Sequence, residues 1–248
     1  MSLHLQMLGT GSAFAKKYYN NNALVQCNGA KLLIDCGYTA PRALHELGIT
    51  PDQIDGILVT HLHADHIGGI EEMAFQLHYL YHKKTKLFVP SLLQRTLWEN
   101  SLKGSMESLQ EGLTGLSSFF DVIILHEEQP LECFDGIQVE IIRTEHIPGK
   151  PSFSLVLNQK IFYSADIRFS PDFLQNEVVG ARNCQHILHD CQLKGPGIVH
   201  TALAELLSLP ESIQSKIYLM HYDDDMESYI GQTGPMEFIK QQHLYTFF

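Results

Sequence analysis

The sequence predicts an α/β fold, formed by two internally similar halves within a single domain that spans residues 1–248. Three observations support this prediction. Hydrophobic residues occupy 44% of the positions and charged residues only 18%, as in globular chains with a large core. Predicted strands dominate the first part of each half, and helices follow them. No linker rich in Pro or Gly and no low-complexity tract divides the chain.

Periodicity and turn residues give the elements in order. Alternating residues predict strands at 2–8, 22–27 and 31–35, and Asn28-Gly29 is a turn signal between the last two. The continuous apolar run 56–60 predicts a buried strand. Further strands are expected at 86–89, 120–125, 137–144, 153–157, 160–164, 186–189 and 216–220. Helices are expected at 39–48, 68–81, 90–101, 171–178 and 199–207.

Three segments lie outside this regular pattern. Residues 102–118 contain few apolar anchors and three glycines, which predicts a mobile insert or lid. The apolar tail 244–248 is expected to pack as an edge strand or in a dimer contact. The acidic run 223–225 is interpreted as a solvated turn.

Composition excludes several classes of protein. The formal net charge is −11, from 17 basic and 28 acidic residues, so stable binding to nucleic acid is not expected. No apolar stretch is long enough to span a bilayer, and no signal peptide is recognised. The five cysteines are odd in number and lack C-x2-C spacing, which argues against a disulfide framework or a thiolate zinc site. A cytoplasmic location fits best.

The decisive motif directly follows the predicted buried strand 56–60. Four potential metal ligands lie within six residues, namely His61, His63, Asp65 and His66. A tight loop at a strand end can direct such side chains to two adjacent points, whereas a regular helix or strand cannot. Imidazole and carboxylate groups are ligands for Zn²⁺, Mn²⁺ and Fe²⁺. The motif therefore predicts a metal centre.

One loop cannot complete two ligand shells, so distal ligands are required. Three candidates follow predicted strands, namely His146, Asp166 and His221. Polar side chains at strand ends are the groups that α/β folds place in their sites.

Together these residues resemble the metallo-β-lactamase superfamily, whose fold is a four-layer αβ/βα sandwich with a dinuclear metal site at one edge. The resemblance implies two metal ions, with zinc expected and manganese or iron as alternatives. The first metal would bind His61, His63 and His146, the second Asp65, His66 and His221, and Asp166 would bridge them. The best-known true β-lactamases carry a cysteine at the position of Asp166, which argues against β-lactam hydrolysis.

Further motifs resemble tRNase Z, among them Leu8–Ser12, Leu33–Gly37 and His200-Thr201-Ala202. The chain departs from that family at Ile167 and at His189-Asp190-Cys191, and it lacks a basic arm for tRNA. The compact length, the segment 66–73 and the glycine-bearing insert resemble phage-type anti-Pycsar proteins instead. That family hydrolyses 3′,5′-cyclic mononucleotides, including cyclic CMP and cyclic UMP, to evade a signalling defence.

The resemblance implies a two-metal phosphodiesterase with a small anionic nucleotide substrate. Asp65 would orient or deprotonate the attacking water, and His200 would be the general acid, with Asp190 fixing its tautomer. A homodimer is expected, with residues 102–118 reaching across.

Three other functions remain open. A tRNA 3′ endonuclease would need the missing basic arm. A thioester or lactone hydrolase of glyoxalase II type would need a C-terminal helical domain, and only 27 residues follow His221. A metal-dependent binding protein without turnover is the third alternative.

Overall fold

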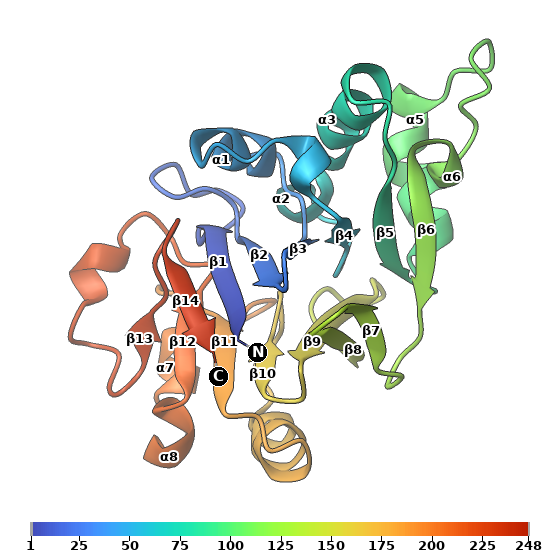
Figure 1. The fold of residues 1–248 in the computed structure, drawn as a ribbon. Helices are drawn as coiled ribbons and strands as arrows, with labels where there is room; N and C mark the ends of the chain where they lie inside the picture. Colours follow the sequence, from blue (N-terminus) through green and yellow to red (C-terminus); the bar gives the residue numbers. More distant parts are fainter. Residues whose placement is uncertain (1, 248) are drawn as a thin grey trace.

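The computed structural model describes residues 2–247, and within them two seven-stranded sheets pack face to face with helices on their outer faces (Figure 1). The first sheet contains β1 (Leu3–Gly9), β2 (Asn22–Cys27), β3 (Ala30–Ile34), β4 (Gly56–Leu58), β5 (Thr85–Pro90), β6 (Phe120–Leu125) and β14 (Leu244–Phe247). The second contains β7 (Leu131–Phe134), β8 (Ile137–Thr144), β9 (Ser152–Leu157), β10 (Ile161–Tyr163), β11 (His186–Asp190), β12 (Ile217–Met220) and β13 (Glu237–Phe238).

The helices are short. Those of the first half are α1 (Ala40–Glu46), η1 (Pro51–Gln53), α2 (Ala64–Ile67), α3 (Ile70–Phe75), η2 (Gln76–Leu80), α4 (Gln94–Thr96), η3 (Leu97–Leu102), α5 (Lys103–Met106) and α6 (Leu116–Phe119). Those of the second half are η4 (Phe173–Ala181), α7 (Leu203–Leu206), α8 (Glu211–Gln214) and η5 (Met226–Tyr229). Helices α1 to α3 cover the first sheet, and α7, α8 and η4 cover the second (Figure 1).

The two sheets repeat one topology, which confirms the prediction of two similar halves. Strands β1, β2 and β3 form an antiparallel meander, and β3, β4, β5 and β6 then run parallel. In the second sheet β8, β9 and β10 form the matching meander, and β10 to β13 run parallel. The carboxyl ends of the parallel strands in each sheet therefore share one edge.

The core has two parts. Side chains alternate across a strand, so neighbouring residues of β9 enter different clusters. Leu155 joins a large apolar cluster that also contains Leu24 of β2, whereas Val156 packs in a smaller one with Leu174 and Leu206 from the outer helices. Burial of both faces explains the continuous apolar runs of these strands.

Most predicted elements are present, with bounds shifted by up to four residues. The apolar tail forms the expected edge strand, since β14 pairs antiparallel with β1. The short strands β7 and β13 were not predicted. The helix expected at 199–207 begins only at Leu203, because two hydrogen bonds hold Thr201 outside it. The Thr201 carbonyl accepts from the Gln192 N–H, and its hydroxyl donates to the Ile167 carbonyl.

The segment 102–118 is anchored more firmly than its sequence indicates. It contains α5 and the start of α6, and a bridge pairs Ser108 with Leu113. Its buried apolar side chains include Leu102, Met106, Leu113 and Leu116. Its role as a lid stays a prediction. Among residues 2–247, no helix is both long and apolar enough to cross a bilayer.

Candidate metal centre

All seven predicted donors lie in segments that follow strands, and two of them, Asp65 and His66, lie in the short helix α2. The loop after β4 carries four of them, and α2 begins within this loop at Ala64. His146 follows β8, Asp166 follows β10 and His221 follows β12. Because the two sheets place these strand ends at one edge, the donors converge from both halves of the chain. Six of the seven side chains are buried, and His63 is half-buried.

The first donor group contains His61, His63, His146 and one oxygen of Asp166. His61 Nε2 and His146 Nε2 lie 3.2 and 3.3 Å from His63 Nδ1. The same two Nε2 atoms lie 3.5 and 3.6 Å from Asp166 Oδ2. A tetrahedron around a zinc ion with ligands at about 2.0–2.1 Å has edges of about 3.3–3.4 Å. The group therefore has the size of a tetrahedral metal site.

The second donor group contains Asp65, His66, His221 and the other oxygen of Asp166. His66 Nε2 lies 3.2 Å from Asp65 Oδ2 and 3.3 Å from Asp166 Oδ1. The corresponding distances from His221 Nε2 are 3.3 and 3.5 Å. Asp166 thus offers one carboxylate oxygen to each group, which is the geometry of a bridging ligand.

Two buried polar atoms of this cluster have no hydrogen-bond partner among the described residues. They are His66 Nε2 and Asp166 Oδ1. Buried polar atoms in folded proteins are normally paired, and a site for a bound ion is one accepted reason for an exception. The orphaned atoms, one nitrogen and one carboxylate oxygen, are suitable divalent-metal donors.

The protonation states suit a metal site. Burial, reinforced by the neighbouring His61, lowers the pKa of His63 to about 4. Burial also lowers the pKa of His146 to about 4, so both imidazoles are neutral and have a free lone pair at neutral pH. Burial opposes the charge on His66, but Asp166, Asp65 and Asp35 raise its pKa well above the ordinary value. A protonated His66 therefore offsets part of the negative charge of these carboxylates, and a bound cation could take over this role.

A buried carboxylate that sequence reasoning assigned no role orients the second group. Asp35 Oδ2 accepts hydrogen bonds from His66 Nδ1 at 2.8 Å and from the Thr60 hydroxyl at 2.7 Å. Its Oδ1 accepts from the Thr60 backbone N–H at 2.8 Å. Such a partner fixes the tautomer of a ligating histidine. The sequence offered two signals, an aspartate at the end of an apolar strand and its place in the Leu33–Gly37 motif that resembles tRNase Z.

Three of the ten left-handed residues other than glycine among residues 2–247 lie at this edge. Asp35, Ala165 and His221 adopt left-handed conformations, with φ values of 58°, 49° and 57°. For residues other than glycine this conformation costs roughly 1–2 kcal/mol each. All three lie where the chain leaves a strand and turns toward the donor cluster, and such strain is typical of functional sites.

His200 lies beside the cluster, next to Asp190. Its Nδ1 is 3.0 Å from Asp190 Oδ2 and 3.9 Å from Asp166 Oδ2, and its ring stacks on His221. Burial would lower the pKa of His200, but the hydrogen bond with Asp190 and the charges of both carboxylates raise it to about 9. The structure thus brings together Asp65, His200 and Asp190, the three residues with predicted catalytic roles.

A cavity of about 560 Å³ opens above the donors. Its walls include His63, Asp65, His146, Asp166 and His200. This volume is within the range of small-molecule sites. The cavity gives a substrate access to both donor groups.

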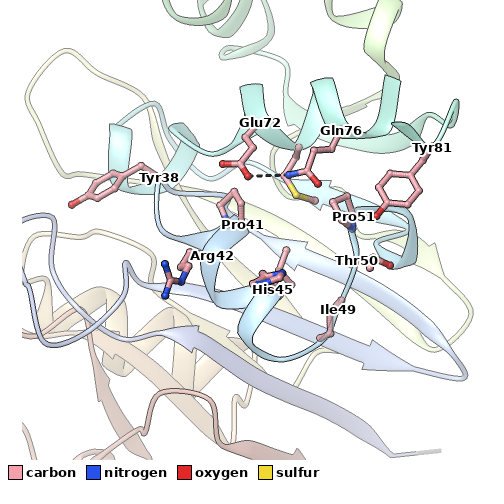
Figure 2. A pocket seen from close by; sticks show the side chains of 12 residues that line it. Tyr38, Pro41, Arg42, His45, Ile49, Thr50, Pro51, Glu72, Gln76 and Tyr81 are labelled. Carbon is pink, nitrogen blue, oxygen red and sulfur yellow. Dashed lines mark hydrogen bonds between the residues drawn. The ribbon is translucent and has the colours of Figure 1, made fainter. Parts of the chain in front are cut away.

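A separate cavity of about 400 Å³ lies between α1 and α3, where Glu72 accepts a hydrogen bond from Gln76 (Figure 2). Its lining includes Arg42 and His45 but none of the seven donors. Tyr38 lies at one end of this cavity and also lines the larger one (Figure 2). Of these two cavities, only the larger has metal donors in its walls. A third cavity, of about 390 Å³, also reaches His61, His63 and His146.

Gly37 supports the donor loop and provides a first test. A Cβ atom on Gly37 would lie 1.9 Å from the Asp65 carbonyl oxygen, so Gly37→Ala must displace the loop. We expect this substitution to weaken the affinity for divalent metal by about 10- to 100-fold, the cost of disturbing the support of a metal site. Titration against a chromophoric chelator measures the affinity. Gly104→Ala is the matched control, because a Cβ there meets nothing within 4 Å. Unchanged affinity in Gly37→Ala would contradict the prediction.

Comparison with known proteins agrees with this geometry. A metallo-β-lactamase fold protein, YhfI from Bacillus subtilis, superposes with a TM-score of 0.78 at 14% identity and full coverage of both chains. The structure therefore has the predicted metallo-β-lactamase fold. An anti-Pycsar protein Apyc1 of Paenibacillus xerothermodurans is 57% identical over 100% of this chain and 98% of its own length. One from Bacillus phage 010DV004 is 41% identical over 98% of each chain.

The family model described as anti-Pycsar protein Apyc1 matches residues 3–245, nearly the whole chain. The match includes both sheets, the donor loop and all three distal donors. Fold, donor arrangement and sequence similarity thus agree, and the chain belongs to the anti-Pycsar protein Apyc1 family.

Proposed function

We propose that this chain hydrolyses 3′,5′-cyclic mononucleotides, including cyclic CMP, UMP, AMP and GMP, to nucleoside monophosphates. As a member of its family it is a metal-dependent phosphodiester hydrolase. The observation that carries the proposal is the pair of four-donor groups that share Asp166. Two adjacent metal sites are typical of hydrolases and nucleases that act on phosphate esters. Such an activity would remove the signal of a cyclic-nucleotide defence against phage.

The proposed ligands are the seven donors described above. His61, His63 and His146 would hold one divalent ion, Asp65, His66 and His221 the other, and Asp166 both. Neutral imidazoles with two carboxylates favour zinc, with manganese or iron as alternatives. Two bound cations would stabilise charge on the phosphate oxygens and lower the pKa of a water molecule at the site.

Asp65 and His200 would handle the two ends of the reaction, the attacking water and the proton for the leaving group. Contacts with His66 and His221 hold the pKa of Asp65 below its usual range despite burial, so its carboxylate is ionised. Of its two proposed roles, this favours orienting the attacking water over deprotonating it. His200 donates Nδ1–H to Asp190, which leaves Nε2 to carry the second proton. The hydrogen bond to Asp190 favours the imidazolium form of His200, which would protonate the leaving ribose oxygen.

Charge and cavity size support a small substrate. The net charge of −11 opposes an extended polyanion, whereas one phosphodiester can reach the donor groups without spreading over the acidic surface. A cavity of about 560 Å³ suits a mononucleotide better than a tRNA acceptor stem. A tRNA endonuclease is therefore the second candidate, and a thioester or lactone hydrolase the third.

Metal removal and a substrate panel test the proposal. We expect zinc- or manganese-loaded protein to open cyclic mononucleotides, chelator-treated protein to be inactive, and added metal to restore activity. Liquid chromatography would measure products from four cyclic mononucleotides, a tRNA precursor and a glutathione thioester in parallel. Inertness toward all four cyclic nucleotides would sink the proposal. Cleavage of the precursor or the thioester would then identify the alternative, and tight binding without turnover would indicate a binding protein.

Two further proposals concern the protein's setting. We propose a homodimer, in which residues 102–118 of one subunit reach toward the cavity of the other. Sedimentation measures the oligomeric state. A cytoplasmic location, in the bacterial host if the chain is encoded by a phage, fits a substrate that is an intracellular nucleotide.

A further inference from the structure

The loop between β1 and β2 presents one bare aromatic ring at the mouth of the large cavity. Phe14 is 87% exposed, yet it lines the same cavity as Asp65, Asp166 and His200. A side chain this exposed loses little contact with water on folding and so contributes little to the core. Single exposed apolar side chains are common on protein surfaces, so it is the position of Phe14 in the wall of the donor cavity that points to a ligand contact.

The loop that carries Phe14 is held rigidly by the acidic run after His221. Asp224 accepts hydrogen bonds from the backbone N–H groups of Lys16 and Lys17 at 2.8 and 2.7 Å. Asp223 accepts from the Ser12 hydroxyl at 2.7 Å, and the Ser12 N–H donates to the Tyr222 carbonyl at 2.9 Å. The expected solvated turn is therefore an anchor.

A second anchor joins the loop to the start of α1. The Tyr38 hydroxyl donates to the Ala13 carbonyl at 2.8 Å, directly beside Phe14. Tyr38 is 46% exposed and lines the cavity as well. Phe14 is thus presented by a loop that is fixed on both sides of the ring, so little conformational entropy remains to be lost when a ligand binds.

The metal donors fix where the phosphodiester would lie, at the floor of the cavity. The base of a cyclic mononucleotide must then extend away from the floor toward the rim. Every base has a π face, and stacking on an aromatic side chain does not depend on which base is present. Apart from Lys16 and the Tyr38 hydroxyl, the rim side chains are apolar, namely Ala13, Phe14, Ile147 and Val199.

We propose that Phe14 is the stacking platform for the substrate's base, positioned by Asp224 through the loop backbone. The inference rests on the proposed function and deepens it. Stacking rather than base-edge hydrogen bonding would allow pyrimidine and purine cyclic nucleotides to share one site. Phe14 would thus set KM, while the donor groups and His200 set the rate of the chemical step.

The test compares Phe14→Ala with Phe14→Tyr on two kinds of substrate, cyclic nucleotides and a cyclic phosphate without a base. We expect Phe14→Ala to raise KM for cyclic CMP and cyclic AMP by at least about fivefold with little change in kcat. A baseless ribose 3′,5′-cyclic phosphate should be hydrolysed equally by wild type and variant. Phe14→Tyr keeps the ring and should retain wild-type KM. Calorimetric titration of metal-loaded protein with a cyclic phosphorothioate should show the same loss of affinity in Phe14→Ala.

Asp224→Ala tests the anchor. It should raise KM in the same direction but by less, again without an effect on the baseless substrate. An equal loss on both substrates, or an unchanged KM in Phe14→Ala, would overturn the inference. So would dissociation of a dimer by Phe14→Ala in sedimentation, because the ring would then be a subunit contact. Inactivity of the wild type toward cyclic nucleotides would instead refute the proposed function, and the calorimetric comparison would still report on the platform.

Discussion

Replacement of Asp166 by alanine is expected to reduce cyclic-nucleotide hydrolysis by more than about 10⁴-fold and bound metal from two ions per chain to one or none. Asp166 offers one oxygen to each donor group, so a single substitution removes a ligand from both. Two-metal stabilisation supplies several kcal/mol in the transition state, and each 1.4 kcal/mol is about tenfold in rate. Inductively coupled plasma mass spectrometry counts the metal, and initial rates give the activity.

The control for this prediction is Asp121→Ala. Asp121 is exposed on β6 and contributes to neither donor group, so this variant should keep two metals and full activity. The prediction is wrong if Asp166→Ala retains two ions per chain and more than about a hundredth of the wild-type rate.

His200→Gln is expected to lower kcat for cyclic nucleotides by about 10²- to 10⁴-fold, the usual contribution of a general acid. Hydrolysis of bis-p-nitrophenyl phosphate should change far less, because p-nitrophenolate is a stable anion that needs no proton to leave. The raised pKa of His200 and its hydrogen bond to Asp190 support this role. Steady-state kinetics on the two substrates measure the difference.

His45→Gln is the matched control for that substitution. His45 is exposed on α1 and lines the separate cavity between α1 and α3, away from the donors (Figure 2). It should leave both activities unchanged. Equal losses on the two substrates in His200→Gln would indicate that His200 orients ligands rather than donates a proton.

Much of the metal centre could be predicted because ligand chemistry is local. The motif after β4 places four donors in six residues, and this density has no simple structural explanation. His146, Asp166 and His221 could be found because each directly follows an apolar strand. Parallel strands bring their carboxyl ends to one edge, so position along the chain was enough to predict convergence.

Other features depend on tertiary contacts that no local pattern contains. Asp35 is typical of any strand end until His66 and Thr60 are seen to donate to it. The late start of α7 results from bonds that Thr201 makes with distant segments. Asp224 resembled a solvated acidic residue because its partners, the N–H groups of Lys16 and Lys17, lie far earlier in the chain.

The convergence of donors from both sheets has a thermodynamic consequence. Ligands that follow β4 in one sheet and β8, β10 and β12 in the other exist as a set only when both halves are folded and docked. A cation that binds only this assembled state adds stability of RT ln(1 + [M]/Kd), about 4 kcal/mol at a thousand times Kd. Metal binding would thereby favour the correctly docked chain, because a chain with misdocked halves lacks the complete set of ligands.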